Sequence, residues 1–129
     1  MTSALILIVD DNATNLKLAR VVLAGAGFEV RTANDAEEAL HVLEVCRPRV
    51  VLTDIQLPGI DGLEFTRRLK GDPARSGLVV IALTAYAMVG DEERARAAGC
   101  DAYLTKPIDP DGLVRTVESF TSSPAPLKR

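Results

Sequence analysis

The sequence predicts an α/β protein in which one sheet of five parallel strands is covered by helices on both faces. Short apolar runs typical of strands alternate along the 129 residues with segments of helical period, which is the pattern of strand–helix–strand units. The run Leu78–Leu83 is apolar throughout, as expected of a strand covered on both faces. A chain of this length forms one domain and buries roughly two-thirds of its unfolded surface.

The strand-like runs define the order of the elements. They are Leu5–Val9, Phe28–Thr32, Val50–Thr53, Leu78–Leu83 and Ala102–Leu104. The third run leads directly into Asp54. Five helices are expected to connect and follow these strands, so the whole pattern is strand and helix in strict alternation.

Each expected helix carries apolar residues at helical spacing. The apolar positions are Leu16, Ala19, Val22, Leu23 and Ala26 in the first helix, Ala36, Ala39, Leu40 and Leu43 in the second, Leu63, Phe65, Thr66 and Leu69 in the third, and Leu113, Val114, Val117 and Phe120 in the last. Gly27 is expected to end the first helix in the left-handed conformation. Asn34 with Glu37 is expected to cap the second, and Asp109 before Pro110 to begin the last.

The fourth helical segment, Met88–Ala98, has a thin apolar face. Ala95 and Ala98 join Met88 on it, whereas Asp91 and the charged residues that follow are expected to be solvated. Elements with little apolar burial are the ones that rearrange at low cost. Residues 1–121 are expected to form the domain, and residues 122–129 a flexible tail or the stump of a linker.

Composition excludes several classes of function. With 47% apolar residues, 26% charged residues and a net charge of −3, the chain is typical of a soluble globular protein without a nucleic-acid-binding face. The N-terminus predicts neither a signal peptide nor a membrane span, so a cytoplasmic protein is expected. Cys46 and Cys100 lack metal-site spacing and are expected to be reduced thiols, and His41 is expected at the surface.

Reactive side chains follow four of the five strand-like runs. Asp10 and Asp11 follow the first, Asp54 the third, Thr84 the fourth, and Lys106 comes shortly after the fifth. The carboxyl ends of parallel strands meet at one edge of a sheet, where open α/β sheets bind ligands. These five side chains are therefore expected to meet in one site.

The chemistry of this residue set favours magnesium and phosphate. Three neighbouring carboxylates repel one another without a cation, and an oxygen-only donor set with no nearby His or Cys suits Mg²⁺. With Lys106 added, the formal charges of the site and Mg²⁺ sum to zero, so an anionic phosphoryl group could approach. One carboxylate could then act as nucleophile toward phosphorus, with Thr84 and Lys106 as ligands for the phosphoryl oxygens.

Four stretches together resemble the receiver domain of two-component response regulators: Val9–Asn12, Leu52–Gly62, Ala82–Ala87 and Gly99–Pro107. The resemblance covers about residues 4–121. Within it, the run Thr84–Pro107 is similar to stand-alone, DivK-like receivers and to the receivers of hybrid histidine kinases. It implies a flavodoxin-like, doubly wound (βα)5 fold with strand order 2-1-3-4-5.

The resemblance also implies a role for each site residue. Asp54 would take a phosphoryl group from a phosphohistidine on a histidine kinase or a histidine phosphotransfer protein. Asp10, Asp11, Asp54 and the backbone carbonyl of Gln56 would hold Mg²⁺. The chain would then be a phosphoacceptor in a phosphorelay, and its only catalysis would be transfer of the phosphoryl group to and from itself.

A phosphate cradle and a switch are implied in the same way. Thr84, Lys106 and the backbone N–H of Ala85 would hold the phosphoryl oxygens, and Tyr103 would rotate inward when Thr84 moves. Phosphorylation would thereby change a docking surface for a downstream protein, in a monomer or weak dimer.

Two positions bear on the lifetime of the phosphoryl group. Gln56 and Tyr86 lie two residues beyond Asp54 and Thr84, and the resemblance implies that they would flank the path of an attacking water. A bulky Tyr86 beside a neutral Gln56 offers no carboxylate to orient that water, so slow self-dephosphorylation is expected.

Three alternatives remain open at this stage. A Mg²⁺-dependent phosphohydrolase of the haloacid dehalogenase type also uses an Asp nucleophile, a Thr and a Lys, but it begins from Asp-x-Asp, which does not follow Leu5–Val9. A scaffold that keeps the fold without phosphorylation usually lacks one of the acidic or lysine positions. The chain could also be the receiver part of a hybrid histidine kinase or of a longer response regulator.

Overall fold

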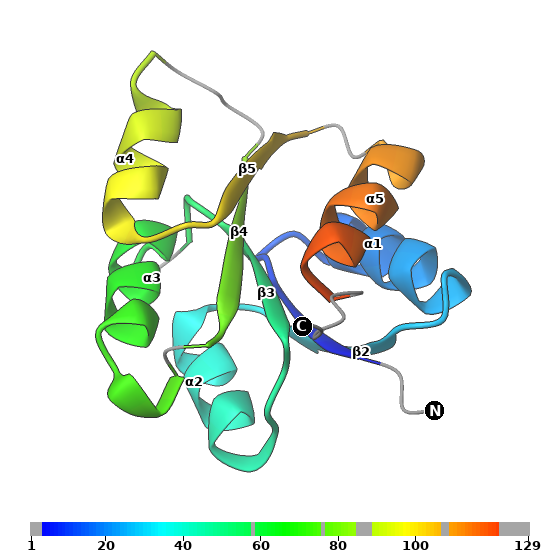
Figure 1. Ribbon diagram of the computed structural model, residues 1–129, viewed down its shortest axis with the longest axis horizontal. Coiled ribbons are helices and arrows are strands. Elements are labelled where there is room, and N and C mark those ends of the chain that lie inside the picture. The colour runs from blue at the N-terminus through cyan, green and yellow to red at the C-terminus, as the bar shows by residue number, and fades with distance from the viewer. Residues whose placement is uncertain (1–3, 58, 76, 85–88, 107–108, 122–129) are drawn as a thin grey trace, which may run out of the picture.

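Five parallel strands in the order β2-β1-β3-β4-β5 form the centre of the molecule (Figure 1). The computed structural model describes residues 4–57, 59–75, 77–84, 89–106 and 109–121. The strands are β1 Leu5–Val9, β2 Glu29–Ala33, β3 Val50–Asp54, β4 Val79–Thr84 and β5 Ala102–Thr105. The helices are α1 Ala13–Gly25, α2 Ala36–Val45, α3 Gly62–Lys70, α4 Asp91–Ala98 and α5 Pro110–Thr121, with a short 3-10 turn, η1 Pro73–Arg75, after α3. This is the predicted α/β class and strand order.

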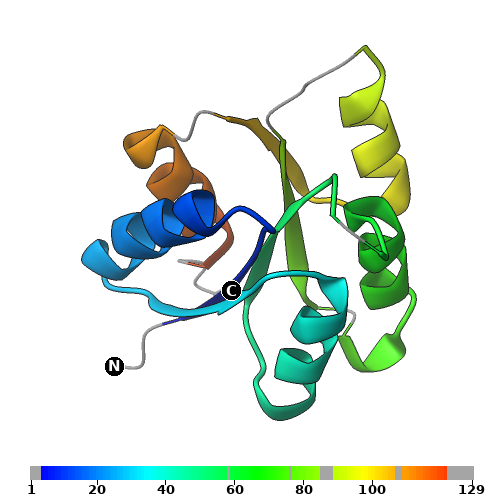
Figure 2. The ribbon, with the colours of Figure 1, turned by 180° about the vertical axis from the view of Figure 1, so that it is seen from behind.

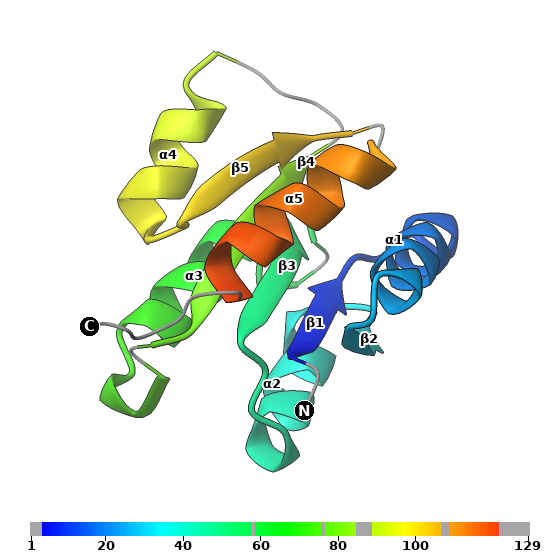
Figure 3. The ribbon, with the colours of Figure 1, turned by 45° about the vertical axis from the view of Figure 1, so that its right-hand side comes forward.

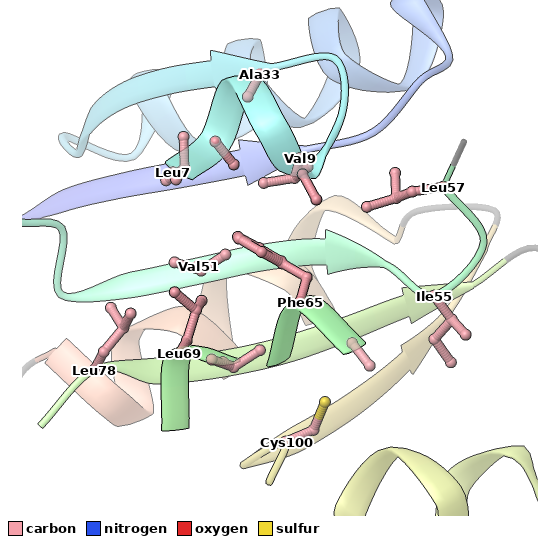
Figure 4. Packing of buried hydrophobic residues seen from close by; sticks show 14 of the residues in the cluster. Leu7, Val9, Ala33, Val51, Ile55, Leu57, Phe65, Leu69, Leu78 and Cys100 are labelled. Atoms are coloured by element: carbon pink, nitrogen blue, oxygen red, sulfur yellow. The ribbon is translucent and has the colours of Figure 1, made fainter. Parts of the chain in front are cut away.

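The helices cover the two faces of the sheet separately. α1 and α5 lie on one side, and α2, α3 and α4 on the other (Figures 1 and 2). Alternate residues of β1 point to opposite faces, so Ile6 and Ile8 pack with α1 and α5 whereas Leu7 and Val9 pack with the other helices. Figure 4 shows the cluster that contains Leu7 and Val9, in which Phe65 of α3 is fully buried over the sheet.

The bounds of β2, β3, β4 and β5 differ from the sequence prediction by one residue, and the starts of α2 and α4 differ from it as well. The cap of α2 is Asp35, whose Oδ1 accepts a hydrogen bond from the Glu38 N–H at 2.8 Å, one residue later than the predicted Asn34 with Glu37. The Asn34/Glu37 pair and the Asp35/Glu38 pair both fit the capping pattern. With Asp35 as the cap, α2 begins at Ala36, which is buried in the core. α4 begins at Asp91 instead of residue 88, because Gly90 is in the left-handed region at φ 89°.

Other local predictions are confirmed. Gly27 has φ 99°, α5 begins at Pro110 after Asp109, and His41 is at the surface with 79% of its side chain exposed. Cys46 and Cys100 form no disulfide with each other. Within the described residues, no helix is long and apolar enough to cross a lipid bilayer. Met88 and the tail 122–129 lie outside the described residues.

Candidate functional site

The strand register brings the predicted site residues to one edge of the sheet. Val9 pairs with Thr53 and Thr84 pairs with Thr105, so four neighbouring strands end at nearly the same level. Their arrows point in one direction (Figure 3). Asp54 and Thr84 are the last residues of β3 and β4, and Lys106 immediately follows β5.

The three predicted carboxylates lie together. Asp10, Asp11 and Asp54 each offer one oxygen, and these oxygens all lie within 4.8 Å of one another. Asp10 and Asp54 are only 2% and 8% exposed, whereas Asp11 is open to solvent. A buried pair of carboxylates with a third at its entrance is a hard-oxygen donor set with access from solvent, and it fits Mg²⁺.

Lys106 supplies the positive charge of the site. Its Nζ lies 2.6 Å from Asp10 Oδ2 and 2.9 Å from Asp54 Oδ2, and its side chain is 8% exposed. Burial lowers the pKa of Lys106, but the hydrogen bonds and negative charges of both carboxylates outweigh burial and raise it above its ordinary value. The lysine is therefore a fixed cation at neutral pH, and it leaves the three carboxylates with a net formal charge of −2.

Backbone N–H groups fix the orientation of the two buried carboxylates. The Asn12 N–H donates to Asp10 Oδ1 at 2.9 Å, and the Gln56 N–H donates to Asp54 Oδ1, also at 2.9 Å. Lys106 binds the second oxygen of each group. Both oxygens of each carboxylate are thus hydrogen-bonded, so the Asp54 side chain is held in one orientation.

Thr84 and Tyr103 lie on the two neighbouring strands β4 and β5. Thr84 is buried, and its backbone carbonyl accepts a hydrogen bond from the Lys106 N–H at 2.7 Å. Tyr103 pairs in register with Ala82, and its half-buried ring packs against the cluster under α3 and α4. Burial raises the pKa of Tyr103, and the negative charge of Asp91 raises it further.

The hydroxyl of Tyr103 is unusual because its oxygen is buried. Within the described part of the chain this oxygen has no hydrogen-bond partner. A buried unpaired hydroxyl destabilises the side-chain orientation that contains it. Ala85 and Tyr86, the other predicted residues of this region, lie outside the described residues.

Gly62 belongs to the site, although sequence analysis did not assign it there. A Cβ at Gly62 would lie 2.0 Å from the backbone oxygen of Asp54 and 2.8 Å from Cα of Ile55. The Gly62 N–H donates to the Ile55 carbonyl at 2.8 Å, so the start of α3 is attached to the backbone that carries Asp54. Asp61 and Gly62 are residue types that favour turns, but only the fold shows the close approach.

The fold and the site together define the class of the protein. A parallel sheet in this strand order, with an acidic triad, a buried lysine and a threonine at the carboxyl edge of its strands, is typical of signal-receiver domains. The family model for the response regulator receiver domain matches residues 6–118, and the chain belongs to this family. It is therefore a receiver domain of the two-component type.

Individual relatives agree in sequence and structure. The chain is 44% identical over 115 residues to the polar-differentiation response regulator DivK of Brucella anthropi, which covers 89% of this chain and 94% of that protein. A putative response regulator from Chloroflexus aurantiacus is 35% identical with a TM-score of 0.90, covering 95% of this chain and 100% of that structure. The receiver domain of the sensor histidine kinase PA1611 from Pseudomonas aeruginosa, described with a magnesium ion in its active-site cleft, is 32% identical with a TM-score of 0.85 and the same coverage.

Proposed function

We propose that this receiver domain is a phosphoacceptor in which Asp54 takes a phosphoryl group from a phosphohistidine on a histidine kinase or a histidine phosphotransfer protein. The observation that carries the proposal is the environment of Asp54: a carboxylate 8% exposed, bound by the Gln56 N–H and by Lys106, beside Asp10 and Asp11. Family membership supports the same role.

The transfer itself needs only positioning and neutral charge. An Asp54 carboxylate oxygen attacks the phosphorus, the new O–P bond forms while the P–N bond breaks, and the imidazole nitrogen leaves with the electron pair and takes up a proton. Lys106 is hydrogen-bonded to Asp54 Oδ2, so its ammonium group is close enough to bind the phosphoryl oxygens after the transfer. Thr84 and the backbone N–H of Ala85 would complete the cradle.

Magnesium would be held by Asp10, Asp11, Asp54 and the backbone carbonyl of Gln56. The donor set consists of oxygens alone, and the three carboxylates with Lys106 carry a formal charge of −2. When bound, Mg²⁺ supplies the compensating positive charge that lets an anionic phosphoryl donor approach. Without a cation, the same carboxylates would repel the donor.

Phosphorylation would be transmitted through Thr84, Tyr103 and α4. Ala95 and Ala98 are the only buried apolar residues of α4, so little apolar area holds this helix in place. If Thr84 moved toward the phosphoryl group, the Tyr103 ring could rotate inward, and the surface beside α4 would change. A downstream protein would bind one form of that surface more tightly than the other. Amide exchange in residues 91–98 should change when the beryllofluoride phosphoryl mimic is added with Mg²⁺, and unchanged exchange would contradict this part of the proposal.

The remaining parts of the proposal concern context. We expect the domain to act in the cytoplasm, as a monomer or weak dimer, and to lose its phosphoryl group slowly because a bulky Tyr86 beside a neutral Gln56 offers the attacking water little space and no carboxylate. The Tyr86→Ala variant tests the last point, because an unchanged phosphate half-life would contradict it. A small phosphoester should not be turned over, which distinguishes this function from a phosphohydrolase.

The test of phosphoacceptance is incubation with phosphoramidate and Mg²⁺, followed by intact mass. The wild type should gain the mass of one phosphoryl group, and Asp54→Asn should gain none. Asp35→Asn is the matched control, because Asp35 caps α2 and is not one of the three clustered carboxylates, and asparagine is also a good cap. No addition to the wild type, or equal addition to Asp54→Asn, would overturn the proposal.

A further inference from the structure

A cavity of about 410 Å³ lies at the opposite edge of the sheet from Asp54. It is bounded by the end of α2, the loop that leads into β3, and the segment between α3 and β4. Ligand pockets in proteins typically have volumes of about 300–1,000 Å³. The cavity therefore has the size of a small-molecule site, and none of the residues assigned to phosphoacceptance lines it.

The lining combines apolar residues with charged side chains of both signs. Leu43, Pro48 and Leu78 are buried residues of the lining, whereas Arg47 and Arg49 are exposed. Such a mixture of apolar contact and a few polar groups is characteristic of sites that bind small organic molecules. The buried apolar residues would contact the apolar part of such a molecule, and the arginines would bind its charged group.

The two arginines are not engaged elsewhere. Arg75, the third guanidinium of the lining, is paired with Asp72 at 2.7 Å. Arg47 and Arg49, by contrast, form no ion pair and no side-chain hydrogen bond within the described part of the chain. Glu44 and Asp72 also line the cavity, so its three arginines and two carboxylates leave a formal charge of +1 in a chain of net charge −3, and the two unpaired guanidiniums can bind an anion.

We infer that this cavity binds a small organic anion, a carboxylate or phosphate ester with an apolar body, through Arg47 and Arg49. Guanidinium groups bind carboxylate and phosphate through paired hydrogen bonds, and Leu43 and Leu78 offer the apolar contact. The binding is independent of phosphoacceptance and forms a second site on the domain.

The two sites lie at opposite ends of the same strands. β3 begins beside the cavity and ends at Asp54, and β4 likewise ends at Thr84. Five residues of strand span about 16 Å at roughly 3.3 Å per residue. The anion would therefore bind without displacing a phosphoryl group, and both could be present at once.

The test is an NMR titration of the ¹⁵N-labelled protein with three probes. The 2-naphthoate ion carries both a ring and a charge, 2-naphthamide carries the ring alone, and inorganic phosphate carries the charge alone. Naphthoate should shift the amides that line the cavity in a saturable way, and each of the other probes should bind at least fivefold more weakly. Naphthoate shifts confined to other parts of the molecule, or equal binding of naphthamide, would overturn the inference.

Variants test the role of the arginines. The double variant Arg47→Glu/Arg49→Glu should bind naphthoate at least tenfold more weakly, whereas Arg20→Glu, an exposed arginine of α1, should bind it as the wild type does. Unchanged affinity in the double variant would refute the assignment. Ala74→Phe keeps both arginines and fills the cavity from an exposed lining position, so it should also lose binding, and retained binding would refute the location even if the double variant fails to fold.

Discussion

Replacing Gly62 with alanine is expected to damage the domain because α3 begins against the backbone of Asp54. The added Cβ would lie 2.0 Å from the Asp54 carbonyl oxygen, 2.9 Å from the carbonyl carbon and 2.8 Å from Ile55 Cα. All three atoms belong to the backbone, so no side chain can rotate to relieve the contact. Either the start of α3 or the end of β3 must move by about 1 Å or more to reach an ordinary contact distance.

The cost can be estimated from the contacts that must change. Overpacking of a well-packed region costs about 1–3 kcal/mol. Loss of the 2.8 Å hydrogen bond from the Gly62 N–H to the Ile55 carbonyl adds about 1 kcal/mol. The better helix propensity of alanine returns up to about 1 kcal/mol. The variant should therefore lose roughly 1–4 kcal/mol of unfolding free energy, and a loss in the middle of that range lowers Tm by about 10 °C in a domain of this size.

The assay is urea and thermal denaturation followed by circular dichroism, with Gly25→Ala as the control. Gly25 is the last residue of α1, and a Cβ there would meet no atom within 4 Å. The control should change stability by no more than about 1 kcal/mol, in the stabilising direction if at all. Phosphorylation by phosphoramidate should also be slower in Gly62→Ala, because the displaced backbone carries Asp54. If the two variants were equally stable, the close approach would be refuted.

Three further predictions concern polar and titratable side chains. Tyr103→Phe should raise the unfolding free energy by about 1 kcal/mol, because it removes a buried hydroxyl that has no partner in the described chain; a loss of stability in urea denaturation would contradict this. Asp101→Ala should lower it by about 1–3 kcal/mol, since Asp101 accepts from Lys70 Nζ at 2.7 Å and from the Val80 N–H at 2.9 Å, and an unchanged urea midpoint would contradict a stabilising role of these two bonds. The pKa values of Cys100, Tyr103 and Lys106 are raised in the folded protein from ordinary values of 9.0, 10.0 and 10.5. The stability that these three groups contribute is therefore fully present below the ordinary pKa values, and it is lost as pH rises through the folded-state pKa values. Urea midpoints measured from pH 7 to 11 should stay level to about pH 9 and then fall, and the fall should be smaller in Lys106→Met; a rise with pH would contradict the directions.

The sequence predicted the position of the site because one physical rule covers it. Parallel strands share a carboxyl edge, so residues at strand ends must converge, and the convergence of Asp54 and Lys106 to 2.9 Å confirms that reasoning. The strands themselves were predictable from apolar runs, and boundaries differed from the structure by a residue or so. The roles of these residues in phosphoryl transfer remain predictions.

What the sequence could not predict depends on long-range packing. Asp91 reads as a solvated helix residue, but it is buried and pairs with Arg94 at the first turn of α4. Gly62 reads as a turn residue, yet its importance comes from a backbone eight residues earlier in the chain. The cavity beside Arg47 and Arg49 leaves no periodic pattern at all, because it arises where two loops meet at the far edge of the sheet.

The central proposal is that one phosphoryl group becomes covalently bound to the carboxylate of Asp54, and chemical localisation of that group tests it most directly. An aspartyl phosphate can be reduced with borohydride to homoserine, which marks the modified residue for peptide mass mapping. After treatment with phosphoramidate and Mg²⁺, homoserine should be found at position 54 and should be absent at positions 10 and 11. Homoserine at Asp10 or Asp11, or none at Asp54, would contradict the proposal.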